Sequence, residues 1–116
     1  HEDLESVVAI YQANLRTARA LGHAYGFRVL AYWQPTVFDK LTKSRHETRQ
    51  AAKSAGIEPW IRQARTLGAP GGVTDLSAIF RDEPAPVFID AWHVGERGNA
   101  VIAERIAEDV RRVLAR

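Results

Sequence analysis

Apolar residues recur at helical spacing near both ends of the chain. At the start they predict one helix over about residues 3–25, and Gly26 follows as a typical C-terminal cap. This apolar face consists of Leu4, Val7, Val8, Tyr11, Leu15 and Ala18. A second helix is predicted over about residues 96–116, since it carries a similar stripe. We expect that stripe to be buried, and it consists of Ile102, Ala103, Ile106, Val110, Val113 and Leu114.

Two further runs are almost continuously apolar. Residues 27–33 are rich in β-branched and aromatic side chains and end at Gln34-Pro35, where proline cannot extend a central ladder. Residues 87–89 form a shorter run of the same kind. Because runs that are apolar on both faces are typical of parallel sheets, we predict a strand at each.

Helices are predicted between these two strands. The Ser44-x-x-Glu47 pattern is a capping box that opens a helix over about residues 44–54. A second helix over about 59–67 begins with a proline, which is tolerated in the first turn. Residues 75–80 are expected to form one helical turn.

The resulting order is helix, strand, helices, strand and helix, which indicates an α/β fold with a parallel sheet. Two strands are too few for a stable parallel sheet, so we infer that the sheet is incomplete in this chain. We therefore expect residues 1–116 to be one portion of a single domain. We interpret about residues 39–86 as a helical insertion. For residues 39–72 we favour a solvated insertion, with a lid or specificity element over the site as the alternative.

Composition removes several classes of function. The 116 residues contain no cysteine, which excludes disulfides, thiolate nucleophiles and zinc–thiolate sites. No apolar run is long enough to span a bilayer, so we expect a soluble protein. Its compartment, cytoplasmic or secreted/periplasmic, is left open by the sequence. The net charge is only +2 and the basic residues are scattered, which argues against nucleic acid as a partner.

The second apolar run delivers the residues with the clearest chemistry, Asp90 and His93. Ligands of open α/β sheets bind beyond the carboxyl ends of strands, where both side chains are expected. A carboxylate can fix the tautomer of an imidazole, which can then act as general base. The alternative is that Asp90 caps a turn and His93 is an ordinary loop residue. The other histidines, His1, His23 and His46, have no ligand spacing, so we expect no metal site.

Residues 87–103 combine an apolar strand, the Asp90-x-x-His93 motif, a Gly98-Asn99 pair and a helix of the Ile-Ala type. This segment resembles the C-terminal block of the SGNH hydrolases, also called GDSL-like lipases and esterases. Further similarity to the preceding part of that family lies in Tyr11-x-x-Asn14-Leu15, Tyr25-Gly26 and Gln34-Pro35.

The resemblance implies a three-layer α/β/α, flavodoxin-like fold and a serine hydrolase that cleaves acyl esters without a cofactor. It implies that His93 is the catalytic base and Asp90 its orienting acid. None of the serines here fits the family's Gly-Asp-Ser motif, and no asparagine fits its oxyanion motif; the serines are Ser6, Ser44, Ser54 and Ser77. The expected partner is therefore the N-terminal part of the same enzyme, and this chain alone should be inactive.

Two residues are candidates for substrate binding. Trp92 lies between the acid and the base, and Gln34 ends the first predicted strand. Both have an alternative: Trp92 can pack beneath the loop, and Gln34 can bond to backbone. A second interpretation of the whole chain also stays open, namely a non-catalytic binding or assembly module on the same scaffold.

Overall fold

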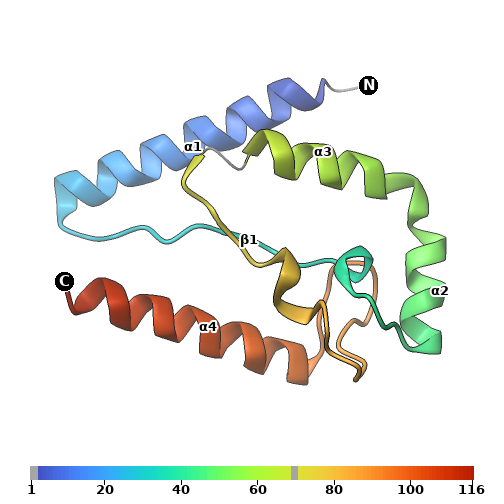
Figure 1. Cartoon of the computed structure of the whole chain (residues 1–116). Coiled ribbons are helices and arrows are strands. Elements are labelled where there is room, and N and C mark those ends of the chain that lie inside the picture. The colour runs from blue at the N-terminus through green and yellow to red at the C-terminus, as the bar shows by residue number, and fades with distance from the viewer. Residues whose placement is uncertain (1–2, 69–70) are drawn as a thin grey trace. The chain divides into compact units, whose positions relative to one another are not determined.

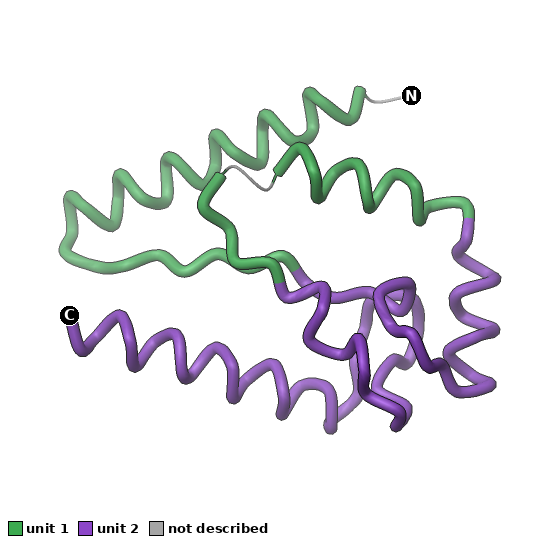
Figure 2. Tube along the Cα trace, in the orientation of Figure 1, with its two compact units in different colours: residues 1–33, 56–75 green, residues 34–55, 76–116 purple. Residues whose placement is uncertain are grey.

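The computed structural model describes residues 3–68 and 71–116, which form a mixed α/β structure that is mostly helical and contains a two-stranded parallel sheet (Figure 1). The chain divides into two compact units (Figure 2). Unit 1 takes residues 1–33 and 56–75, and unit 2 takes residues 34–55 and 76–116. None of the described helices is long and apolar enough to cross a membrane.

Unit 1 is built on two helices that lie side by side, α1 (Leu4–Tyr25) and α3 (Glu58–Gly68) (Figure 1). Asp3 caps α1 by accepting a hydrogen bond from the amide of Glu5, and Gly26 ends it in the left-handed conformation at φ 76°. The buried core of the pair consists of Leu4, Val8 and Ala64. Both predicted helices are confirmed.

The sheet of unit 1 is much shorter than expected. Strand β1 (Tyr32–Trp33) pairs in parallel with β2 (Thr74–Asp75), and the amide of Thr74 donates to Ala31 O at 2.8 Å. The prediction of a strand over all of residues 27–33, buried on both faces, is wrong. Phe27 is 50% exposed, and β2 was not predicted from the sequence.

The physical reason lies in what surrounds residues 27–33. A continuous apolar run forms a buried strand only where neighbours occupy its edges and helices cover its faces. Within the described residues, β2 supplies two paired positions on one edge. The rest of the run is extended chain, although its first residue is held by a bond from the Phe27 amide to Gly22 O at 2.9 Å.

Unit 2 contains α2 (Arg45–Lys53), α4 (Glu96–Leu114) and two single turns of 3-10 helix, η1 (Val37–Asp39) and η4 (Ser77–Phe80). A third such turn, η2 (Ala55–Ile57), follows α2. The helices predicted in these regions are confirmed. The core consists of Val37, Phe80, Val87, Phe88 and Ala91.

Residues 87–89 are not a strand, which corrects the second strand prediction. Phe88 and Val94 form one isolated antiparallel bridge, and the amide of Gly95 donates to Val87 O at 2.8 Å. The chain reverses within a few residues and pairs with itself, so this segment adds nothing to the parallel sheet. Its apolar character comes instead from burial of Val87 and Phe88 in the core of unit 2.

The apolar stripe of α4 is covered over part of its length. Val101 and Ile102 pack against the core of unit 2. Farther along the helix, Val110 is 38% exposed and Leu114 is 77% exposed. The prediction that the whole stripe is buried is therefore wrong for its C-terminal part.

Candidate functional site

Asp90 and His93 lie in the reversal between the two bridged residues, and their side chains meet. Asp90 Oδ2 is 2.7 Å from His93 Nδ1. Asp90 Oδ1 accepts two further hydrogen bonds, from the amide of Trp92 at 3.0 Å and from the amide of His93 at 2.7 Å. One oxygen of the carboxylate thus closes the turn, and the other binds the imidazole.

This pattern gives Asp90 a strong preference for its charged form. The hydrogen bond from the His93 side chain lowers the pKa of Asp90 most, and the amides of Trp92 and His93 lower it further, from 3.8 to about 2. Asp90 is therefore an anion at neutral pH. An anionic acceptor at Nδ1 favours the tautomer of His93 that carries its proton on Nδ1.

The other ring nitrogen of His93 faces no partner within residues 3–68 and 71–116, since its Nε2 receives or donates no hydrogen bond there. The side chain of His93 is 69% exposed and that of Asp90 41% exposed. In the Nδ1–H tautomer, Nε2 carries a free lone pair. The pair can consequently accept a proton from an incoming hydroxyl, which is the chemistry of a general base.

The reversal itself rests on the core of unit 2. Ala91 is buried between the acid and the base, and its carbonyl accepts a 2.8 Å hydrogen bond from the amide of Val37. The amide of Ile89 donates to His93 O at 2.8 Å and so closes the turn across its base. These contacts fix the backbone that carries the two side chains.

The two candidate substrate-binding residues lie in different positions relative to the pair. Trp92 is 38% exposed, and its ring centroid is 6.4 Å from that of His93 at an angle of 59°. Gln34 is exposed, three residues before Val37, whose amide reaches the reversal. Trp92 thus lies beside the imidazole, and a role in substrate binding stays a prediction for both Trp92 and Gln34.

A buried ion pair that was not predicted from the sequence holds the segment leading to this loop. Lys40 Nζ lies 3.0 Å from Glu47 Oε2, and both side chains are fully buried. Glu47 Oε1 also accepts hydrogen bonds from the amides of Val87 at 2.9 Å and Phe88 at 3.1 Å. Lys40 donates in addition to Ala85 O at 2.7 Å. Through Glu47, α2 thus holds the segment that leads to Asp90.

The capping box was the available signal for Glu47, and it is confirmed. The amide of Ser44 donates to Glu47 Oε2 at 2.8 Å, and the amide of Glu47 donates to Ser44 Oγ at 3.1 Å. This local pattern does not reveal the partners 40 residues later in the chain. Nothing in the sequence around Lys40 distinguishes a buried lysine from a solvated one.

The described residues bring no hydroxyl nucleophile to His93. Ser6 bonds to Asp3, Ser44 and Ser54 cap the two ends of α2, and Ser77 begins η4. None of the four serines bonds to His93 in this part of the chain. The described residues also contain no group of three or more His, Asp or Glu side chains that could hold a metal ion.

Comparison of the chain with models of known families, with curated proteins and with solved structures finds no match.

Proposed function

We propose that this chain supplies the acid–base part of a serine hydrolase active site that cleaves acyl esters. The observation that carries the proposal is the arrangement of Asp90: Oδ2 binds His93 Nδ1 at 2.7 Å while two amides hold Oδ1. This leaves an exposed Nε2 as the base. We also propose that the complete fold is a three-layer α/β/α domain of the SGNH type, to which further polypeptide contributes.

The proposed reaction has two stages. In the first, His93 Nε2 takes the proton of a serine hydroxyl as its oxygen bonds to the ester carbonyl carbon, and the imidazolium then protonates the departing alcohol. In the second, His93 activates water, which releases the acid and restores the serine. Asp90 keeps the imidazole oriented and stabilises its positive charge in both stages. The serine and the oxyanion donors come from polypeptide outside this sequence.

The test compares this chain alone with its complex with the N-terminal polypeptide of the same enzyme. The complex should hydrolyse p-nitrophenyl acetate and react with a fluorophosphonate probe, and the chain alone should do neither. Replacing Asp90 by asparagine should lower kcat about 10⁴-fold, since the amide favours the wrong tautomer of His93. An unchanged rate in the Asp90→Asn complex would contradict the proposed role.

Two other results would redirect the assignment. Turnover by the chain alone that disappears in the His93→Ala variant would place the nucleophile within these 116 residues. A stable complex that neither reacts with the probe nor hydrolyses esters would support the alternative, a non-catalytic binding or assembly module.

A further inference from the structure

Three consecutive residues before Asp90 are held by two neighbouring side chains of α2. Glu47 accepts from the amides of Val87 and Phe88, as described above. His46 Nε2 lies 2.6 Å from Ile89 O. Because a carbonyl oxygen can only accept, His46 must donate this bond from Nε2–H.

We propose that His46 and Glu47 are positioning residues for the Asp90–His93 pair. Only the relevance of this positioning to catalysis rests on the proposed function. Ile89 O belongs to the same planar peptide unit as the amide of Asp90. Fixing that oxygen sets the plane from which Asp90 projects. Fixing the two preceding amides sets the path of the chain into that plane.

The contacts of α2 take the place that a neighbouring strand holds in a sheet. In the described part of the chain, no strand pairs with residues 87–89 on the side that faces α2. The amides of Val87 and Phe88 are instead satisfied by the carboxylate of Glu47. Hydrogen bonds to a charged acceptor are about twice as strong as neutral ones. Lys40 keeps that carboxylate charged and in place through its 3.0 Å contact.

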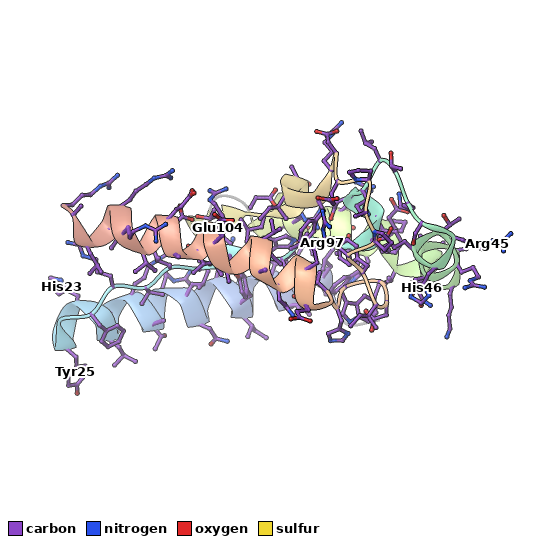
Figure 3. All side chains as sticks on the ribbon, turned by 90° about the horizontal axis from the view of Figure 1, so that it is seen from below. His23, Tyr25, Arg45, His46, Arg97 and Glu104 are labelled. Carbon is purple, nitrogen blue, oxygen red and sulfur yellow. The ribbon has the colours of Figure 1, made fainter. Side chains whose placement is uncertain are left out.

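His46 and Glu47 differ in burial, which makes the proposal testable. Glu47 is fully buried, so its removal affects folding as well as position. His46 is exposed on α2, next to the equally exposed Arg45 (Figure 3). Loss of the His46 side chain therefore removes the bond to Ile89 O and little packing.

The experiment measures the tautomer of His93 in this chain by ¹⁵N NMR of the imidazole. In the unaltered protein the Nδ1–H form should dominate, because Asp90 accepts from Nδ1. The His46→Ala and Glu47→Ala variants should each lose most of that excess and approach the mixture of a free imidazole. His46→Gln should restore it, since its amide can donate to Ile89 O.

Three controls separate positioning from general destabilisation. Arg45→Ala changes the adjacent residue of the same helix and should leave the tautomer unchanged. Val101→Ala weakens the core of unit 2 away from these contacts and should lower the midpoint of thermal unfolding without moving the tautomer. Asp90→Asn should abolish the Nδ1–H excess and gives the full range of the signal.

The proposal is overturned if His93 keeps its Nδ1–H excess in folded His46→Ala protein while Asp90→Asn removes it. It is equally overturned if Val101→Ala moves the tautomer as far as His46→Ala does. If Glu47→Ala fails to fold, the His46 variants alone decide. A failure of the ester hydrolysis test would leave these spectra unaffected, so the two proposals can fail separately.

Discussion

The buried pair Lys40–Glu47 predicts an unequal response to the loss of each partner. When Lys40 is replaced by methionine, the carboxylate of Glu47 keeps three amide donors, from Ser44, Val87 and Phe88. When Glu47 is replaced by leucine, those three amides lose their acceptor, and the ammonium of Lys40 keeps only Ala85 O. The second change therefore leaves more buried polar groups unsatisfied.

The magnitudes follow from this count. Removing one partner of a buried ion pair, which leaves the other charge without compensation, costs about 3–5 kcal/mol, and we expect this for Glu47→Leu. Lys40→Met breaks the same pair together with the Lys40 bonds to both Glu47 oxygens and to Ala85 O. Three amides still satisfy the remaining carboxylate, so we expect a cost at the lower end of that range, about 3 kcal/mol. Urea unfolding at pH 7, followed by circular dichroism, measures both. An equal cost for the two variants, or a greater cost for Lys40→Met, would refute the reasoning.

The pH dependence of stability gives an independent measure of Glu47. Burial raises its pKa, but the amides of Val87 and Ser44, the side chain of Lys40 and the amide of Phe88 together lower it from 4.5 to about 2. That difference corresponds to about 3 kcal/mol of folding free energy. Because the folded pKa is the lower one, this stability is present above about pH 4.5 and disappears as the pH falls through about 2.

Asp90 titrates in the same range, so every chain in this comparison, including the one otherwise unaltered, carries Asp90→Asn. Between pH 6 and pH 2, the otherwise unaltered chain should lose about 3 kcal/mol more than Glu47→Leu does. Lys40→Met should retain part of this loss, because amides still stabilise the carboxylate. Parallel pH profiles for the unaltered protein and Glu47→Leu would show that Glu47 is not held as a buried anion.

Two further predictions concern local backbone geometry. A Cβ at Gly22 would lie 2.5 Å from Phe27 O. Gly22→Ala should therefore lower the free energy of unfolding in urea by about 1–3 kcal/mol, although alanine has the better helix propensity. Gly56→Ala is the control, because nothing lies within 4 Å of a Cβ there, and it should not destabilise the fold. Ser44→Ala removes the cap of α2 and should cost about 1 kcal/mol, measured by the shift of the thermal midpoint, and a shift within error would contradict the capping role.

Local patterns were enough to predict the helices and the motif of the candidate site. The spacing of apolar residues located α1 and α4, and the capping box located the start of α2, because these signals depend on neighbours a few positions apart. The Asp90-x-x-His93 spacing likewise pointed to two side chains that the fold places 2.7 Å apart.

The strands could not be predicted in the same way. An apolar run shows that side chains are to be buried, but it does not show what covers them. Val87 and Phe88 are buried by η1, η4 and α4 packing around them, whereas Ile89 and much of 27–31 are exposed among the described residues. The contacts of Lys40, His46 and Glu47 with residues 85–89 join distant parts of the chain, which no short pattern records.

The carboxylate of Glu47 completes a helix cap with one oxygen and captures two amides from 40 residues onward with the other. Initiation of a helix and closure of a long loop thereby share a single chemical group. If α2 formed without this loop, Glu47 Oε1 would lack its amide donors, so helix formation and loop closure should be cooperative during folding. Hydrogen exchange at Ser44, Val87 and Phe88 should accordingly proceed through one common opening, with the same dependence on denaturant at all three amides.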